Sequence, residues 1–162
     1  MKALQLLAVV STALLVGTTF VPVLEMASQF AMSGGMWLVV QRTLYRPLAA
    51  VGGPLEILTI VIQLALVAAA LSRAHLLFLT AGSAISLILA FAIWVLFTQP
   101  AHLQVLEWNE GALPADWQRW RDQWEFSELI RFLLQLTGLL LLASSLLNLT
   151  IDEGPESRLA HG

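Results

Sequence analysis

The sequence contains four long apolar runs, which restrict the chain to folds in which the apolar side chains of these runs can face lipid. A helix needs about 20 apolar residues to cross the hydrocarbon core of a bilayer. The chain has 162 residues, of which 58% are hydrophobic and 12% charged, and its mean hydropathy is +0.79. We therefore predict an all-α, polytopic membrane protein with a bundle of four transmembrane helices. The runs lie at about residues 3–31, 55–71, 76–98 and 126–149.

The first apolar run is interpreted as a retained span. Lys2 followed by an apolar stretch has the form of a secretory signal peptide, but the apolar character continues to Ala31, which is long for the hydrophobic part of a signal. The later spans also need a partner to complete a bundle. We expect residues 1–149 to form one transmembrane domain and residues 150–162 to form a flexible polar tail.

The segment between the first two spans is expected to hold a short interfacial helix. Ser33-Gly34-Gly35 should end the first helix, because paired glycines favour turns. Residues 36–51 are too few and too charged to cross, and their Trp37 and Tyr45 are expected at headgroup level. This helix is predicted to end near Pro47, and Gly52-Gly53-Pro54 is predicted to begin the second span.

Residues 117–135 carry the densest mixture of charged and aromatic side chains in the chain. Their ionisable groups are three or four residues apart, which places them on one stripe of a helix. The stripe runs into the last apolar run, where a charge is costly unless it finds a partner or water. It predicts either a functional site or simply the interface at which the helix begins. Its members are Arg121, Glu125, Glu128, Arg131 and Gln135.

Carboxylates from three helices are expected to gather near one end of the bundle. Ion pairing with nearby arginines is one interpretation, because desolvated charges must satisfy one another. In the other, a desolvated Glu acts as general base on an acidic C–H or O–H group and an arginine stabilises the anion. The carboxylates are Glu25, Glu56, Glu125 and Glu128, and the groups alongside them are Arg42, Arg46, Gln99, His102, Arg121 and Arg131.

The sequence disfavours several other classes of site. It contains no cysteine, which excludes thiolate ligands and disulfides. Carboxylate metal sites in four-helix bundles use Glu and Glu-x-x-His pairs, and here Glu125-x-x-Glu128 replaces that pattern. We predict no cofactor and keep a carboxylate-bound metal as the less favoured alternative. The net charge of −3, without a basic run or a glycine-rich phosphate loop, predicts no nucleic-acid partner.

Tryptophan is concentrated in one region, since four of the six tryptophans lie within residues 108–124. One interpretation is an aromatic belt at the membrane surface. The other is an aromatic lid over a ligand cavity at the mouth of the bundle, with Trp117 and Trp124 touching the substrate.

The basic residues divide almost evenly between the two sides of the membrane. We expect both termini in the cytoplasm and the protein in a bacterial inner membrane. Antiparallel spans place Lys2, Arg73 and Arg158 on one side, and Arg42, Arg46, Arg119 and Arg121 on the other.

Residues 97–132, FTQPAHLQVLEWNEGALPADWQRWRDQWEFSELIRF, resemble the small four-helix membrane proteins grouped with the anthrone oxygenases. The resemblance implies a four-helix membrane fold. It also implies oxidation of activated phenolic carbons with molecular oxygen, without an obvious metal or flavin. The residues that carry it are Thr98, Pro100, Trp117, Arg121, Trp124, Glu125 and Arg131.

This chain departs from that family at two positions. Relatives commonly have an Asn after the third span, where this chain has His102 or Gln104. They have a His in the fourth span after the Trp-Glu pair, where this chain has Glu128.

The leading hypothesis is a membrane protein that binds a hydrophobic, phenolic or aromatic substrate inside its bundle. The base would be Glu125 or Glu128, and Arg121 or Arg131 would hold the developing anion. The alternative is a non-catalytic membrane component whose charged stripe pairs within the bundle or with another subunit. Transport is the third hypothesis, disfavoured because no inverted repeat is evident. The expected substrate contacts are Glu25, Arg42, Arg46, Glu56, His102, Trp117 and Trp124.

Overall fold

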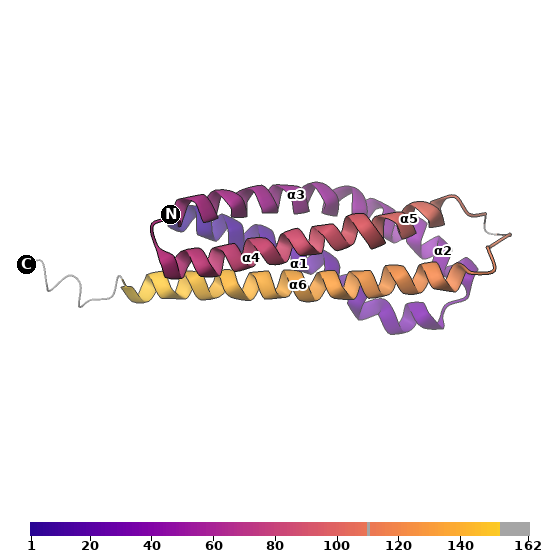
Figure 1. Cartoon of the computed structure of the whole chain (residues 1–162). Helices are drawn as coiled ribbons and strands as arrows, with labels where there is room; N and C mark the ends of the chain where they lie inside the picture. The colour runs from indigo at the N-terminus through magenta and orange to yellow at the C-terminus, as the bar shows by residue number, and fades with distance from the viewer. Residues whose placement is uncertain (110, 153–162) are drawn as a thin grey trace, which may run out of the picture.

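Four long helical segments lie side by side in the computed structural model, which describes residues 1–109 and 111–152, with side chains for all of these except 148–152. Figure 1 shows the start of α1 and the end of α6 at one end of the bundle, called here the end that holds the termini, and the connection to α6 at the other. Each segment is long and apolar enough to cross a membrane, which confirms the prediction of an all-α integral membrane bundle. The segments begin with α1 (Lys2–Ala31) and end with α6 (Trp117–Asp152).

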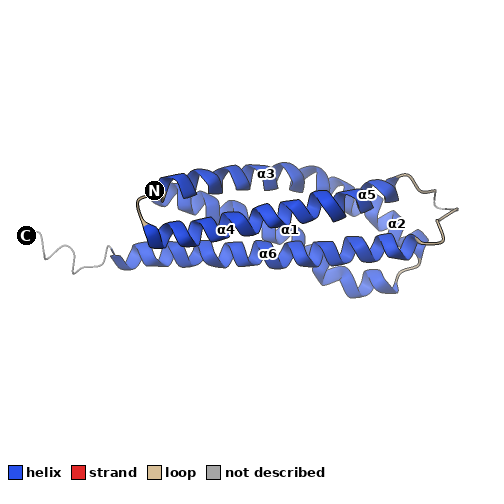
Figure 2. Cartoon of the chain, viewed as in Figure 1, coloured by secondary structure: helices blue, strands red, loops and turns tan. Residues whose placement is uncertain are grey.

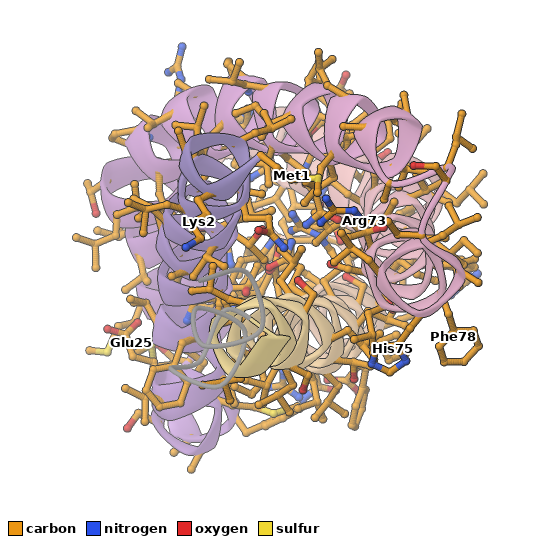
Figure 3. The ribbon with its side chains drawn as sticks, turned by 90° about the vertical axis from the view of Figure 1, so that its left-hand side faces the viewer. Met1, Lys2, Glu25, Arg73, His75 and Phe78 are labelled. Carbon is orange, nitrogen blue, oxygen red and sulfur yellow. The ribbon has the colours of Figure 1, made fainter. Side chains whose placement is uncertain are left out.

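The polarity of the bundle is the reverse of that of a water-soluble protein. Large apolar side chains such as Leu24, Phe78 and Leu96 point outward and are exposed. Figure 3, seen from the end that holds the termini, shows Phe78 directed away from the bundle. Many of the buried residues are polar, and on α6 they recur every three or four residues, as a helix with one inward face requires. They include Arg121, Glu128, Arg131, Gln135 and Ser145.

The second segment is continuous from Gly34 to Ala69. It consists of α2 (Gly34–Val40), a π-helical turn η1 (Gln41–Tyr45) and α3 (Arg46–Ala69). The predicted break before it is confirmed, since the Ser33 side chain accepts a hydrogen bond from the Met36 N–H.

The predictions that a separate interfacial helix ends near Pro47 and that a new helix begins at Gly52-Gly53-Pro54 are wrong, because the helix runs through both places. In η1 the N–H of Arg46 bonds to the carbonyl of Gln41, five residues back. This wider turn lies directly before Pro47, whose ring would clash in a regular helix interior. Within lipid, a broken backbone would leave polar groups without partners, which also favours continuation.

The third segment follows the same pattern. It comprises α4 (Ala74–Ile93), a second π-helical turn η2 (Trp94–Thr98) and α5 (Gln99–Leu106). The prediction that it ends at Thr98 is wrong. The N–H of Gln99 bonds to the carbonyl of Trp94, and Pro100 follows immediately, in the same place after its π-turn as Pro47.

The last helix begins at Trp117, directly after Asp116. Figure 2 shows the non-helical connection before it. The helix starts earlier than the apolar run that predicted the last span at about residue 126, because its first turns pack against α2 and α5. It continues to Asp152, so residues 150–152 belong to it. The rest of the predicted tail, residues 153–162, lies outside the described residues.

Two buried clusters mark the two ends of the bundle. Near the termini, Ala8, Leu66 and Leu142 form an apolar layer between α1, α3 and α6. At the other end lies a larger group, called here the aromatic cluster. It consists of Trp37, Leu38, Tyr45, Ala101, Val105, Trp108 and Trp124.

Replacing Gly34 with Val is expected to lower the free energy of unfolding by about 1–3 kcal/mol. A Cβ atom at Gly34 would lie 2.5 Å from Leu113 Cδ1 and 2.9 Å from Trp117 Cε2, so the Leu113 and Trp117 side chains, or α2 itself, would have to shift. Gly35→Val is the matched control, because a Cβ atom there meets nothing within 4 Å. Denaturation of the detergent-solubilised protein with SDS measures the free energy of unfolding of both variants. Equal losses in the two variants would contradict the packing argument.

Candidate functional site

An arginine between two glutamates lies at the centre of the bundle. Arg131 Nη2 is 2.8 Å from Glu56 Oε2, and Arg131 Nη1 is 2.6 Å from Glu128 Oε1. All three residues are buried, and Glu56 has no exposed surface. Glu128 and Arg131 are one turn apart on α6, whereas Glu56 comes from α3. Buried charges of this kind must be paired closely to be tolerated.

Two further side chains extend this group to a third helix. Gln135 Nε2 donates to Glu56 Oε1 at 3.0 Å, so both oxygens of Glu56 are bonded. Thr19 on α1 then donates to Gln135 Oε1 at 2.7 Å. We call Thr19, Glu56, Glu128, Arg131 and Gln135 the ion-pair network. It links α1, α3 and α6 inside the bundle.

A cavity of about 50 Å³ adjoins this network. It has room for on the order of three water molecules. Its apolar wall includes Trp94 and Trp124 from two different helices. The polar side chains that line it are Thr18, Thr19, Tyr45, Thr98, Gln99, His102, Glu128 and Arg131.

Both π-helical turns contribute to the cavity wall. Tyr45 ends η1, and η2 supplies Trp94 and Thr98. Turns of this type are frequent at functional sites, because the wider turn changes the direction of the side chains that follow. Thr98 is fixed by a 2.8 Å hydrogen bond between its Oγ1 and the hydroxyl of Ser127 on α6.

Glu25 belongs to a second polar group, away from Arg131. The Tyr45 hydroxyl donates to Glu25 Oε2 at 2.6 Å and accepts from Gln29 Nε2 at 2.7 Å. Trp37 Nε1 donates to Gln29 Oε1 at 3.0 Å. Glu25 itself is half-buried, and Figure 3 shows it at the periphery of the bundle. Trp37 and Tyr45, which the sequence predicts at headgroup level, are both buried inside the bundle.

Two arginines outside the ion-pair network bind other groups. Arg121 pairs with Asp122 at 2.9 Å, and its guanidinium lies over the rings of Phe30 and Trp117. Arg42 donates to the carbonyls of Leu106 and Trp108, which ties the second helical segment to the end of the third.

Of the residues predicted to form the site, the structure brings together Glu56, Glu128, Arg131, His102 and Trp124 at or beside the cavity. It does not bring the others there. Arg46 is exposed, Trp117 is half-buried at the start of α6, and Glu25, Arg42, Arg121 and Glu125 are absent from the cavity lining.

The sequence argument missed Tyr45, Trp94, Thr98 and the glycine pair at 52–53 as lining residues. A pattern that could have indicated them is the pair of prolines, Pro47 and Pro100, inside segments that are otherwise helical, since a proline often marks an irregular helical turn.

The tryptophans form a buried group. Trp37 lies 6.3 Å from Trp108 and 6.4 Å from Trp117, measured between ring centroids, and Tyr45 meets Trp124 edge to face at 4.6 Å. Trp37, Trp108 and Trp124 are almost fully buried, which does not fit a belt of side chains facing lipid headgroups. The aromatic cluster instead covers the cavity on the side of the connection.

Glu125 is 1% exposed, and neither of its carboxyl oxygens has a hydrogen-bond partner within the described residues. The indole N–H of Trp37 is directed to Gln29. Both oxygens of the other buried glutamate, Glu56, are bonded. A buried carboxylate without a hydrogen-bond partner is costly, so removal of the charge of Glu125 should not destabilise the protein.

The isosteric substitution Glu125→Gln is therefore expected to leave the free energy of unfolding unchanged or to raise it by up to about 1 kcal/mol. Glu56→Gln is the matched control, because it removes the charge that faces Arg131 and should be clearly destabilising. Thermal unfolding in detergent compares the two variants. A large loss for Glu125→Gln would mean that its carboxylate has a partner.

Comparison of the chain with protein-family models, with curated proteins and with solved structures gave no match. The functional argument therefore depends on the geometry of the cavity and the ion-pair network, together with the residue pattern at 97–132.

Proposed function

We propose that this integral membrane protein binds a hydrophobic molecule with an acidic O–H or activated C–H group, and that Glu128 removes the proton. The observation that carries the proposal is the cavity, in which a paired carboxylate and guanidinium face aromatic walls inside the bundle. Such a combination of apolar walls and a few convergent polar groups is typical of ligand sites.

Glu128 is better suited to the role of base than the other buried glutamates. Only its Oε1 is bonded to Arg131, whereas both oxygens of Glu56 are bonded to side chains of α6. Glu128 also lines the cavity, and Glu125 does not. Arg131 lines the cavity as well and would stabilise the anion that forms when the proton leaves.

The reaction suggested by the resemblance to anthrone oxygenases is conversion of a ring CH₂ to C=O by molecular oxygen. Glu128 would take the first proton, and the carbanion so formed would transfer its electrons to O₂. One oxygen atom would become the carbonyl oxygen, and the other would leave as water with the two hydrogens of the CH₂ group. Tyr45 and His102 supply further hydrogen-bonding groups at the cavity wall.

We further propose that the protein resides in a bacterial inner membrane with both termini in the cytoplasm. The start of α1 and the end of α6 lie at one end of the bundle, which fits an even number of spans. The cavity then lies nearer the opposite face of the membrane, because it is lined by residues from the half of the bundle that adjoins the connection.

A non-catalytic structural function is the second candidate. The observation that favours it is that Arg131 is paired with two carboxylates and that hydrogen bonds continue to Thr19, so the network joins three helices without any ligand. Transport is not supported, because no inverted repeat is evident in the sequence.

Oxygen uptake separates the two candidates. The protein in lipid nanodiscs is supplied with anthrone, and an oxygen electrode and the absorbance of anthraquinone are followed together. The proposed activity predicts equal molar amounts of O₂ consumed and quinone formed, at a rate above that of empty nanodiscs. Binding of the phenol 1-naphthol tests separately whether the cavity takes a ligand. If the rate equals that of empty nanodiscs and 1-naphthol does not bind, the structural function is the better explanation.

A further inference from the structure

We infer that the cavity opens sideways to the bilayer, between α3 and η2, and that its ligand enters from the lipid. We call this opening, at Gly52, Gly53, Trp94 and Gln99, the lateral portal. The identity of the ligand rests on the proposed function, but the position of the portal rests on geometry alone.

The two ends of the bundle are closed to the cavity. On the side of the connection, the buried rings of Tyr45 and Trp124 belong to both the cavity wall and the aromatic cluster. On the side of the termini, Arg131 and Thr19 are engaged in the ion-pair network, and beyond them lies the apolar layer of residues 8, 66 and 142. A ligand that came along the bundle axis would have to displace one of these groups.

The burial of the lining residues shows where the cavity reaches the surface. Glu128, Arg131 and Trp124 on α6 are buried and form the inner wall. Six of the seven half-buried lining residues lie on two segments, namely Leu48, Ala49, Gly52 and Gly53 on α3 and Trp94 and Gln99 on the third helical segment; the seventh is Thr18 on α1. The accessible side of the cavity is therefore the gap between α3 and the third segment.

Gly52 leaves space in this gap. A Cβ atom there meets nothing within 4 Å, and one at Gly53 would lie 3.8 Å from the Trp94 ring. By contrast, a Cβ atom at Gly138 would lie 3.3 Å from Ser83 Oγ, where the glycine permits close helix packing. Glycine in a helix costs about 1 kcal/mol relative to alanine. At Gly52 no close helix contact offsets that cost, and the result is an opening.

The surface around the opening is apolar. Val51 on α3 and Val95 and Leu96 on η2 are large, exposed side chains. These residues belong to segments long and apolar enough to span the membrane, so the opening faces lipid. The cavity itself has room for only a few waters. A larger ligand would place its acidic hydroxyl against Glu128 and Arg131 and extend its apolar part through the portal.

Spin labelling tests the portal without any need for activity. The chain has no cysteine, so Gly52→Cys provides a single attachment point for a nitroxide. Gly17→Cys is the lipid reference, because Gly17 is exposed on α1 next to the lining residue Thr18. Gly111→Cys is the water reference, since Gly111 is exposed in the connection before α6. Neither glycine has atoms within 4 Å of an added Cβ.

In reconstituted vesicles, collisions of the nitroxide with molecular oxygen report lipid, and collisions with a water-soluble nickel chelate report water. The lateral portal predicts that the label at position 52 matches the one at position 17, with frequent oxygen and rare nickel collisions. A label at position 52 that behaves like the one at position 111 would overturn the inference, because the cavity would then open to water. Rare collisions with both reagents would overturn it too, since the cavity would be closed.

Blocking the portal provides the second measurement. Gly52→Leu fills the opening without a backbone clash, and Gly17→Leu makes the same change on the lipid-facing side of α1. We expect Gly52→Leu to weaken 1-naphthol binding by about tenfold or more and Gly17→Leu to leave it unchanged. If the parent protein binds no naphthol while the spin label at position 52 reports lipid, the proposed function fails and the portal remains. If naphthol binds equally to both variants, the portal is not the route.

Discussion

Replacing Arg131 with Met is expected to lower the free energy of unfolding by about 3–5 kcal/mol, the largest effect of any single substitution at the site. The substitution keeps a flexible, unbranched side chain but removes the cation that pairs with Glu56 at 2.8 Å and with Glu128 at 2.6 Å. Two buried carboxylates would then face each other without a counter-charge. SDS denaturation of the detergent-solubilised protein gives the free energy, and Arg119→Met on the exposed face of α6 is the control.

Part of the lost free energy of unfolding should be recovered when the two carboxylates are neutralised as well. In the triple variant Arg131→Met, Glu56→Gln, Glu128→Gln, no unpaired charge remains in the network. Replacing a buried ion pair as a whole is often close to neutral, whereas breaking it is not. A triple variant less stable than Arg131→Met alone would contradict this account, because it would show that the charges contribute through something other than their pairing.

The membrane bundle itself follows from the sequence for a simple physical reason. In lipid, the apolar run and the polar stripe of α6 specify opposite faces of the same helix. The local sequence therefore encodes both where the helix spans the membrane and which of its faces points into the bundle. The spacing of Glu128, Arg131 and Gln135 predicts the inward face that the structure contains. The sequence also predicts that Glu56 gathers with the carboxylates of the other helices at one end of the bundle, and Glu56 pairs with Arg131 there.

The boundaries and the exact members of the site could not be predicted in this way. Pro47 and Pro100 ordinarily end helices, but each follows a π-helical turn that depends on contacts with other segments. Glu125 and Glu128 are three residues apart, which separates them by about 60° around the helix axis. That difference decides which carboxylate meets Arg131 and which is buried without a partner. Which of the two glutamates faces Arg131 depends on the packing of the whole bundle, which the spacing along one helix does not give.

Glu128→Gln is expected to reduce anthrone oxidation by about 10²–10⁴-fold, because the amide cannot accept the substrate proton. Glu128 lines the cavity and has one carboxyl oxygen that is not bonded to Arg131, which is why the effect should be specific to this position. Initial rates of oxygen uptake in nanodiscs measure the effect.

Glu125→Gln is the matched control, since it makes the same chemical change one turn away on the same helix, at a carboxyl group outside the cavity lining. Its rate should remain within about twofold of the parent, a difference too small to represent loss of a general base. Binding of 1-naphthol to both variants separates proton transfer from folding, because Glu128→Gln should retain the cavity and still bind the phenol. If Glu125→Gln loses the activity and Glu128→Gln keeps it, the base has been assigned to the wrong carboxylate. If both variants keep the activity, neither glutamate is the base.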